Sequence, residues 1–435
     1  MKNKKTVYMS FATDIINSGH LNIIEKASEL GDIIAGIQTD EVIAQNNRFP
    51  LVDIEERIRI FSSIKNISKV VVQDTLSYKK ILNELKPDYV VHGDDWVNNE
   101  LSFIREEVIK ILSEYGGKLV EFPYTYNNTL TQLNHKLKIQ SGLPEVRRPK
   151  LKRLLKSKDI VSIIEAHSGL SGLIAENTVV RVDEKLKSFD GMWVSSLCDS
   201  TMKGKPDIEL VDFTSRISTI DEIMDVTTKP IILDGDTGGL IEHFVYNIKT
   251  IERIGVSAVI IEDKKGLKKN SLFGTDVSQQ QDSIENFSAK ISAGKRALIS
   301  DDFMLIARIE SLILEIGLED ALKRANAYVN AGADGIMIHS RKKEPDQVFE
   351  FAKEFKKEFP DVPLAVVPTT YCQVTEKELA DHGINIVIYA NHLIRSAYPA
   401  MLNSAKSILS NGSAVEASKK YCVSIKDILG ILPNR

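Results

Sequence analysis

The chain has 435 residues, 43% of them hydrophobic, and a formal net charge of −4. This length allows two or three domains with large cores, and the near-neutral charge predicts neither a nucleic acid nor a membrane as a partner. The cysteines, Cys198, Cys372 and Cys422, lie far apart and lack metal-binding spacing. Since there is also no signal-peptide pattern and no long apolar span, we expect a cytoplasmic protein.

The first 140 residues alternate short apolar runs with amphipathic stretches such as LNIIEKASEL (21–30). Strands that alternate with helices predict a doubly wound parallel sheet. We therefore expect residues 1–140 to form an α/β domain. The runs typical of buried strands are TVYMSFA (6–12), DIIAGIQ (32–38), KVVVQ (69–73), DYVVHG (88–93) and KLVEFPY (118–124).

A basic segment follows this domain. Residues 141–159 read SGLPEVRRPKLKRLLKSKD, with two prolines and a cluster of positive charge. We interpret this segment, with 141–158 as a basic linker between the domains, as a solvated linker plus the first helix of the next domain, in preference to an anion-binding patch.

Residues 159–435 show eight further apolar runs separated by helix-length segments. Eight β/α repeats over this length predict a TIM-type (β/α)8 barrel, here with helices at its C-terminal end. The runs are IVSIIEAH (160–167), GMWVSSL (191–197), PIILDGD (230–236), SAVIIEDK (257–264), FMLIARIE (303–310), DGIMIHS (334–340), PLAVVPTT (363–370) and INIVIYAN (384–391).

Acidic residues stand at the ends of neighbouring barrel strands. Asp234 and Asp236 end the third run, and Glu262 lies near the end of the fourth. A barrel gathers its strand ends at one mouth, and carboxylate oxygens suit Mg²⁺, which binds one or two carboxylates directly and keeps waters. The alternative is that these acids only cap the following helices. The convergence of three acids favours a magnesium site.

Cationic side chains belong to the same region. Arg308 and His339 end the fifth and sixth strands, and Lys268 follows Glu262 by six positions. Cations beside a magnesium site indicate a small anionic substrate that carries phosphate and carboxylate groups.

These residues carry a family resemblance. WVSSL (193–197), LDGDTGG (233–239), EDKKGLKKNS (262–271), ARIE (307–310) and IMIHS (336–340) resemble the phosphoenolpyruvate mutase branch of the isocitrate lyase/phosphoenolpyruvate mutase superfamily. The resemblance implies interconversion of phosphoenolpyruvate and phosphonopyruvate, which forms a C–P bond for phosphonate biosynthesis. It also implies a homo-oligomer, a dimer or tetramer formed through the barrel. The alternative is a phosphonopyruvate hydrolase, although its branch differs in the Asn-Ser of the lid. The lid lacks the lyases' cysteine, so a lyase is not expected.

The resemblance also implies roles for single residues. Asp234 would bind Mg²⁺ directly, with Asp236 and Glu262 in the same shell. A mobile lid would carry three residues that close over the substrate, while the other lid lysines, Lys264, Lys265 and Lys269, would be solvated. The three lid residues are Lys268, Asn270 and Ser271.

Other positions match groups around the substrate. Arg308, His339 and Asn270 would hold the phosphoryl group, and Asp207 would act through the waters of the metal. Trp193 would wall the pocket or belong to the barrel core. Residues whose backbone or hydroxyl would support the enolate oxygens are Ser195, Ser196 and Leu197.

The front domain resembles the cytidylyltransferases. The resemblance lies in FATDIINSGHLNII (11–24), DIEERIRIFSSIK (53–65) and KPDYVVHGDDW (86–96). The first of these motifs joins a strand to a helix N-terminus that can receive nucleotide phosphates, so CTP is a candidate substrate. The nucleotide-binding residues implied are Asn17, Gly19, His20, Asp94 and Thr129.

The catalytic positions of that family are partly changed. Asn17 replaces the first histidine of the signature, Asn46 stands where a lysine binds the triphosphate, and YTYNNTLT (124–131) lacks the arginine of the closing motif. Because nucleotidyl transfer needs cations at the leaving pyrophosphate, we expect slow or absent transfer. The alternative is a non-catalytic nucleotide-binding or assembly module.

Overall fold

The computed structural model describes residues 4–13, 15–44, 50, 52–97, 101–123, 140–182, 185–266 and 268–431. The chain divides into a front unit, 1–161 with 177–190, and a barrel unit, 162–176 with 191–435. Among the described residues, no helix has both the length and the apolar character needed to cross a membrane.

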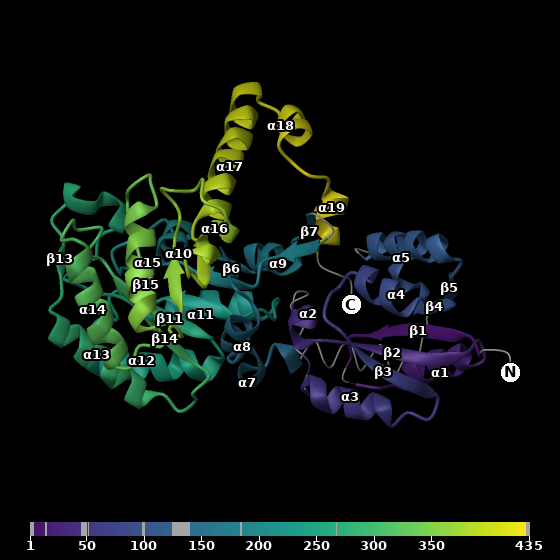
Figure 1. Cartoon of the computed structure of the whole chain (residues 1–435). Coiled ribbons are helices and arrows are strands. Elements are labelled where there is room, and N and C mark those ends of the chain that lie inside the picture. The colour runs from purple at the N-terminus through teal and green to yellow at the C-terminus, as the bar shows by residue number, and fades with distance from the viewer. Residues whose placement is uncertain are drawn as a thin grey trace. The chain divides into compact units, whose positions relative to one another are not determined.

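The front unit is built on a parallel sheet in the order β3-β2-β1-β4-β5 (Figure 1). The order reverses between β1 and β4, which is where doubly wound sheets bind ligands. The predicted fold class and all of the predicted strands of this domain are confirmed. The strands are β1 (Thr6–Phe11), β2 (Asp32–Gln38), β3 (Ile67–Gln73), β4 (Tyr89–Gly93) and β5 (Lys118–Phe122).

Helices cover both faces of this sheet. Ile24 and Phe61, from α1 and α3, pack in one buried cluster, and Leu82 and Val108, from α4 and α5, pack in the other. Continuous apolar strands such as DIIAGIQ are explained by this two-sided burial. The helices are α1 (Ser18–Ser28), α2 (Asp40–Ala44), α3 (Ile54–Ser62), α4 (Lys79–Leu85), η1 (Asp94–Trp96) and α5 (Ser102–Tyr115).

The segment 141–158 is helical rather than an extended linker. It forms α7 (Pro144–Arg147) and α8 (Lys150–Ser157), and it groups with the front unit. Arg147 is fully buried, and so are Leu151 and Leu154 on one face of α8. The helix expected in this segment is present as α8, whose apolar residues recur at helical spacing and pack inward. The burial of Arg147 and of this face of α8 differs from the expected solvated linker. The domain limits 1–140, 141–158 and 159–435 stay a prediction.

An antiparallel hairpin of β7 (Val179–Val182) and β8 (Lys185–Ser188) also groups with the front unit. There the Arg181 guanidinium lies 4.1 Å from the centre of the Phe103 ring, an arrangement that favours a cation–π contact. The sequence analysis did not predict this hairpin.

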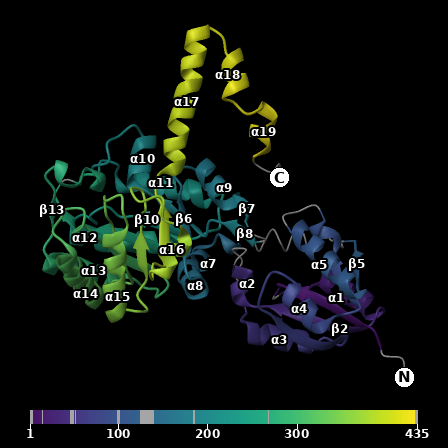
Figure 2. The same ribbon diagram turned by 45° about the horizontal axis from the view of Figure 1, so that its top comes forward.

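The barrel unit contains a closed barrel in the order β10-β11-β14-β15-β16-β17-β6-β9, whose strands lie inside a layer of helices (Figures 1 and 2). Every predicted barrel strand is confirmed. The barrel strands are β6 (Val161–Glu165), β9 (Gly191–Val194), β10 (Ile231–Asp234), β11 (Ala258–Glu262), β14 (Met304–Ile309), β15 (Gly335–Ile338), β16 (Leu364–Val366) and β17 (Ile386–Tyr389).

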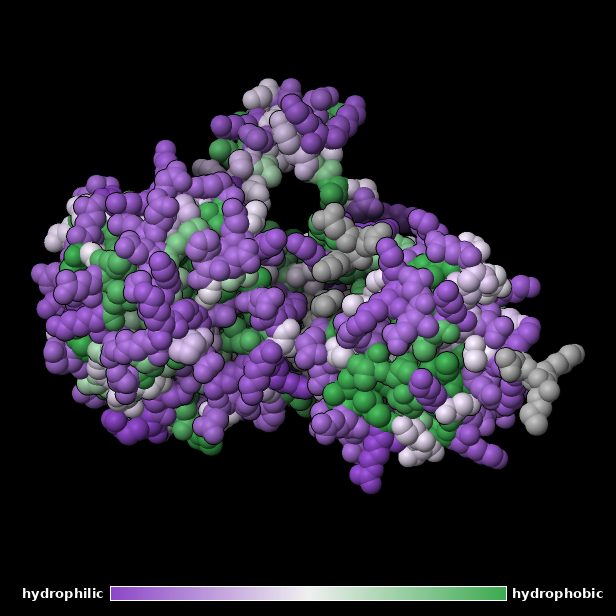
Figure 3. Space-filling model, viewed as in Figure 1, coloured by the Kyte–Doolittle hydropathy of each residue, from purple (hydrophilic) through white to green (hydrophobic). Residues whose placement is uncertain are grey.

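Helices follow the strands and surround the barrel, and hydrophilic side chains cover much of the visible face of this unit (Figure 3). A small hairpin of β12 (Lys264–Lys265) and β13 (Gln280–Gln281) flanks the predicted lid, which includes η2 (Ser271–Asp276). The helices are α9 (Gly169–Asn177), α10 (Ser196–Met202), α11 (Phe213–Met224), α12 (Ile241–Ile254), α13 (Ile284–Ala297), α14 (Leu318–Asn330), α15 (Asp346–Glu358), α16 (Glu376–Asp381), α17 (His392–Asn411), α18 (Val415–Lys420) and α19 (Ile425–Gly430).

Candidate active site

The predicted acids lie at the carboxyl ends of adjacent barrel strands. Asp234 ends β10 and Glu262 ends β11. The carboxylate of Asp234 accepts hydrogen bonds from the amide of Ser196, at 3.2 Å, and from its hydroxyl, at 2.9 Å. Ser196 begins α10, so the helix N-terminus faces this acid. Burial acts to raise the pKa of Asp234, but the charges of Lys268 and Arg216 outweigh it and hold that pKa below its usual range.

The lid lysine lies among these acids. The ammonium group of Lys268 donates to Asp236 and to the hydroxyl of Ser196, and it lies 3.3 Å from a carboxylate oxygen of Asp207. Burial acts to lower the pKa of Lys268, but the surrounding carboxylates, first Asp234 and Asp236, raise it well above its usual range. Lys268 is thus a buried, permanently charged cation at the barrel mouth.

Asn270 reaches the same region from the lid. Its side-chain amide donates to the second carboxylate oxygen of Asp207, at 3.2 Å. Asp207 therefore contacts both Lys268 and Asn270. The structure brings together two predicted lid residues with the predicted acid that they would face.

Arg216 is a cation at this site that the sequence analysis missed. It lies on α11, and its guanidinium donates to a carboxylate oxygen of Asp236 at 2.6 Å. Lys268 donates to the other oxygen of that carboxylate. A lone arginine in DFTSRIS (212–218) gives no sign of this role, because its partner is contributed by another β/α repeat.

Arg308, Ser271 and Glu310 form a second buried network. The Arg308 guanidinium donates to Glu310 and to the hydroxyl of Ser271, and that hydroxyl donates to Glu310 at 2.6 Å. Lys264 also donates to Ser271, at 2.8 Å, and lies 3.3 Å from both Glu262 and Glu310. Ser271 is therefore held against the barrel by charged groups.

The expectation that Lys264 is solvated is wrong. Only 3% of its side chain is exposed, because the carboxylates of Glu262 and Glu310 receive its ammonium group. Lys265 is exposed, as predicted, and Lys269 is partly exposed and donates to the carbonyl of Ser278. The role of Glu310 was also missed, although it ends the ARIE motif.

His339 and Glu262 carry buried polar atoms without a hydrogen bond. These are Nδ1 of His339 and Oε1 of Glu262. Burial, assisted by the charge of Arg308, lowers the pKa of His339 to about 3, which favours the neutral imidazole here. Burial likewise raises the pKa of Glu262 to about 7. Oε1 of Glu262 still lies 3.3 Å from the ammonium group of Lys264. Nδ1 of His339 has no such neighbour among the described residues, and a buried polar atom of this kind is rare in folded proteins and indicates a ligand or an ion at this place.

The remaining predicted residues surround the mouth. Trp193 is buried within β9, so its predicted place in the core or the pocket wall remains open. Ser195 caps α10 and its hydroxyl accepts from the amide of Cys198, at 3.4 Å. Leu197 lies in the first turn of α10 and is partly buried.

The described side chains do not form a ready-made metal cage. No group of three or more His, Cys, Asp or Glu among them is close enough to hold a metal ion. Instead, the acids of this site lie around the ammonium group of Lys268. Such a set fits Mg²⁺, which takes one or two carboxylates directly and reaches the others through its waters.

Three of the predicted nucleotide residues of the front unit, Asn17, Gly19 and His20, lie at the start of α1. Asn17 caps this helix: its side chain accepts from the amide of His20, at 3.1 Å, while Nδ1 of His20 accepts from the amide of Asn17, at 3.2 Å. In a neutral imidazole this bond leaves the proton on Nε2. Gly19 lies in the first turn and Asp94 is exposed at the end of β4. Thr129 and Asn46 lie outside the described residues.

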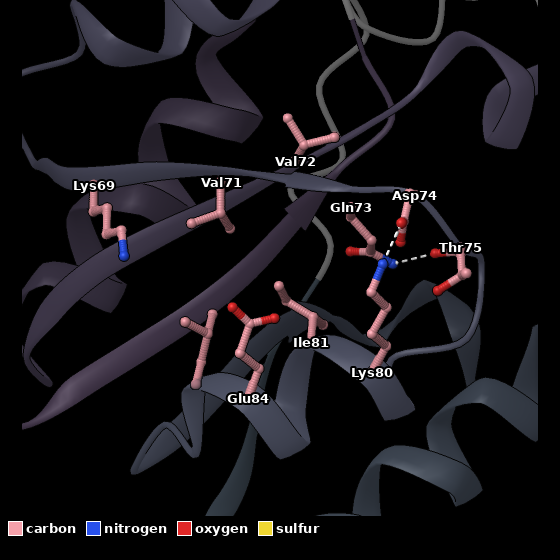
Figure 4. Close-up of a pocket in the computed structure, with 10 residues that line it drawn as sticks. Lys69, Val71, Val72, Gln73, Asp74, Thr75, Lys80, Ile81 and Glu84 are labelled. Atoms are coloured by element: carbon pink, nitrogen blue, oxygen red, sulfur yellow. Dashed lines mark hydrogen bonds and ion pairs between the residues drawn. The ribbon is translucent and has the colours of Figure 1, made fainter.

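A pocket of about 310 Å³ lies in the front unit beside β3 and α4 (Figure 4). Gln73, Asp74 and Lys80 line it, and Lys80 pairs with Asp74. β3 is two strands away from β1 in the sheet, and of the predicted nucleotide residues that the structure describes (Asn17, Gly19, His20 and Asp94) none lines this pocket. The pocket is therefore separate from the predicted nucleotide site.

Known proteins resemble both units of the chain. Residues 13–141 match the family described as cytidylyltransferase-like. A phosphoenolpyruvate phosphomutase of Tetrahymena pyriformis is 39% identical over 271 residues, which are 62% of this chain and 86% of that protein. A phosphonopyruvate hydrolase of Variovorax sp. (strain Pal2) is 35% identical over 281 residues, 64% of this chain and 92% of that protein.

Solved structures are similar over the same region. The crystal structure of phosphoenolpyruvate phosphomutase from Streptomyces platensis subsp. rosaceus has 32% identity and a TM-score of 0.60, and it covers 66% of this chain and 94% of that chain. A phosphonopyruvate hydrolase solved with oxalate and Mg²⁺ has 32% identity and a TM-score of 0.58 over the same shares of the two chains. Residues 151–409 match the family described as phosphoenolpyruvate phosphomutase, and the chain belongs to that family.

Proposed function

We propose that the barrel unit is a phosphoenolpyruvate phosphomutase, which moves a phosphoryl group between the enolate oxygen and C3 of pyruvate. One P–O bond breaks and one P–C bond forms, so atoms and charge balance without another reactant. The observation that carries the proposal is the position of Lys268 and Asn270, lid residues whose side chains contact the acids at the barrel mouth. Such a lid separates a reactive phosphoryl group from water.

The acids of this site are proposed to hold Mg²⁺. Asp234 would bind it directly, while Asp236, Glu262 and Asp207 would bind its waters. When bound, Mg²⁺ stabilises the negative charge of the pyruvate enolate. The amide and hydroxyl of Ser196 orient Asp234 for this task, because both donate to one of its carboxylate oxygens.

Arg308, His339 and Asn270 are proposed to hold the phosphoryl group. Arg308 has its orientation fixed by Glu310 and Ser271. His339 is neutral and buried, so it adds a hydrogen bond without adding charge. Phosphoryl transfer commonly passes through a loose transition state, in which positioning and charge stabilisation matter more than covalent help.

The mutase and the alternative hydrolase differ in whether water reaches the phosphoryl group. A phosphonopyruvate hydrolase lets water capture the phosphoryl group, whereas a mutase must exclude it. Phosphorus NMR of purified protein with Mg²⁺ and phosphonopyruvate tests this directly. We expect phosphoenolpyruvate as the product, since the C–P isomer is the less stable one. Phosphate and pyruvate as the first products would establish the hydrolase instead.

Asp234→Ala tests the metal assignment. The variant should lose turnover and its response to Mg²⁺ together, because an enolate without its cation loses several kcal/mol of stabilisation. Glu354→Gln, on the exposed surface of α15, is the matched control and should behave like the unmodified protein. Activity that persists in a strong chelator would refute the assignment.

For the front unit we propose weak nucleotide binding at the start of α1, with slow or absent transfer of CMP to a small phosphonate. The Asn17 side chain caps the helix, so it supplies no cation to a departing pyrophosphate. Pyrophosphate release from CTP and 2-aminoethylphosphonate measures the transfer, and calorimetric titration of the full chain with CTP measures binding. Brisk transfer would overturn the proposal, and a lack of binding would favour an assembly module.

We also propose a cytoplasmic homo-oligomer formed through the barrel unit. The helices α17–α19 project away from the barrel (Figures 1 and 2), and they expose apolar side chains such as Met401, Leu409 and Ile425. Exposed apolar surface of this kind supports an interface between subunits. Free thiols at all three cysteines suit a reducing compartment. Light scattering after gel filtration measures the oligomeric state, and a monomer would refute the proposal.

A further inference from the structure

Asp236 has an unusual backbone conformation. Its φ is +54°, in the left-handed region that residues other than glycine rarely adopt. This conformation is strained in a residue other than glycine. The surrounding structure must therefore hold it in place, because the relaxed backbone would turn the carboxylate elsewhere.

Two charged side chains hold the backbone at the next residue. The amide of Thr237 donates to Oε1 of Glu209, at 2.8 Å, and the carbonyl of Thr237 accepts from the ammonium group of Lys290, at 2.7 Å. The peptide groups on both sides of Thr237 are thus fixed. The first of these peptide groups joins Asp236 to Thr237, so its orientation sets that of Asp236.

Both residues come from outside the DGDTGG loop. Glu209 lies two positions after Asp207 and has a φ of +58°, and Lys290 lies on α13 with only 6% of its surface exposed. Burial lowers the pKa of Lys290, and the nearby acids, Asp282 and Glu209, act against this effect. A buried lysine that donates to one backbone carbonyl is costly to keep unless that bond has a use.

We propose that Glu209 and Lys290 are positioning residues for Asp236. They hydrogen-bond the amide and the carbonyl of Thr237 and so orient the Asp236 carboxylate toward the metal and Lys268. The proposal rests on the proposed function, because it gives Asp236 its place in the magnesium shell. It makes no use of the side chain of either residue as a ligand. Glu209 also links the loop of Asp207, which contacts the lid, to the loop of Asp236.

The charges of the two residues allow positioning to be separated from electrostatics. Removing the negative charge of Glu209 weakens attraction for Mg²⁺, whereas removing the positive charge of Lys290 strengthens it. If positioning is what matters, losing the contact to Thr237 weakens Mg²⁺ binding at either residue, whereas losing only the charge of Glu209 does not. Loss of an outer residue that orients a metal ligand typically costs about 10–100-fold in metal affinity.

The experiment is calorimetric titration of the full chain with Mg²⁺ alone, without substrate. Glu209→Gly, which accepts the positive φ, and Lys290→Met, which keeps the length of the side chain, should each weaken binding by about 10-fold or more. Glu209→Gln keeps the acceptor for the Thr237 amide and should stay within about 3-fold of the unmodified protein. Circular dichroism of each variant confirms that it is folded.

Three results would overturn the inference. Lys290→Met could bind Mg²⁺ as tightly as the unmodified protein, or Glu209→Gln could weaken binding as much as Glu209→Gly, and either would assign the effect to charge. Lack of Mg²⁺ binding by the unmodified protein would overturn the metal assignment together with this inference. If the unmodified protein is an active mutase, weaker Mg²⁺ binding by Glu209→Gly and by Lys290→Met supports the positioning role.

Discussion

Replacing Glu310 by glutamine tests the buried charge network of the barrel mouth. Glu310 is fully buried directly after β14, where its carboxylate accepts from Arg308 and from Ser271 and lies 3.3 Å from Lys264. Glutamine has nearly the same shape but no charge. The variant therefore leaves the Arg308 and Lys264 cations buried with less compensation.

The size of the effect follows from two arguments. Removing one partner of a buried ion pair costs about 3–5 kcal/mol. Burial acts to raise the pKa of Glu310, but Arg308 and Lys264 outweigh it and depress that pKa from 4.5 to about 2. At about 1.4 kcal/mol per tenfold change in proton affinity, this depression stabilises the folded state by about 3 kcal/mol. We expect Glu310→Gln to cost about 3 kcal/mol at pH 7.

The pH dependence has a definite sign. A carboxyl group with a depressed pKa stabilises the folded state above its unfolded pKa of 4.5, and this stabilisation is lost as the pH falls toward 2. The contribution of Glu310 to the difference between the two proteins should therefore fall to about half of its neutral-pH value at pH 3.

Urea denaturation measures these differences. The chain has two tryptophans, Trp96 and Trp193, so a Trp96→Phe background makes fluorescence report on the barrel alone. Glu354→Gln removes an exposed partner of Lys357 and is the matched control, with little expected effect on stability because solvent screens the pair. A cost for Glu310→Gln as small as that of the control would refute the reasoning.

Two further predictions concern the lid and the front unit. Lys268→Met should lower kcat by about 100–1000-fold, since it removes a preorganised charge at the reacting centre, and Lys269→Met should leave kcat nearly unchanged; phosphorus NMR measures both. If the two lysine variants lose activity equally, the lid assignment is wrong. Asn17→Ala should destabilise α1 by about 1 kcal/mol, whereas Asn17→Asp keeps the cap. Hydrogen exchange of the α1 amides measures this, and equal protection in both variants would contradict the capping role.

The strands of both units could be predicted because each is a short apolar run, and such runs alternate with helix-length segments along the chain. A run such as SAVII (257–261) is too short for a typical helix and is rich in β-branched residues, which favours a buried strand. The β7–β8 hairpin escaped prediction because TVVRV (178–182) and KLKS (185–188) mix charges with apolar residues. Its partner, Phe103, belongs to another element, so the local pattern carries no sign of the pairing.

Site residues could be predicted where the chemistry of a single side chain at a strand end was informative, as for Asp234 and Arg308. The neighbouring residues that shift their pKa values or fix their orientation could not be predicted. Glu262 lies opposite Arg308 in the register of β11 and β14, and this register is set by closure of the barrel. Lys264 lies in a charged stretch that predicts solvation, yet burial between two carboxylates depends on where Glu310 is placed.

The same network limits which part of the lid can move. Ser271 was predicted to travel with the lid, but its hydroxyl bonds to Arg308, Glu310 and Lys264. Releasing it would leave these charged groups with one polar partner fewer in a buried place, which is costly. Lys268 and Asn270, by contrast, contact acids that Mg²⁺ or substrate can engage in their place. Opening of the proposed lid would require the side chains of Lys268 and Asn270 to withdraw from these acids, whereas its hydrogen bonds hold Ser271 beside Arg308.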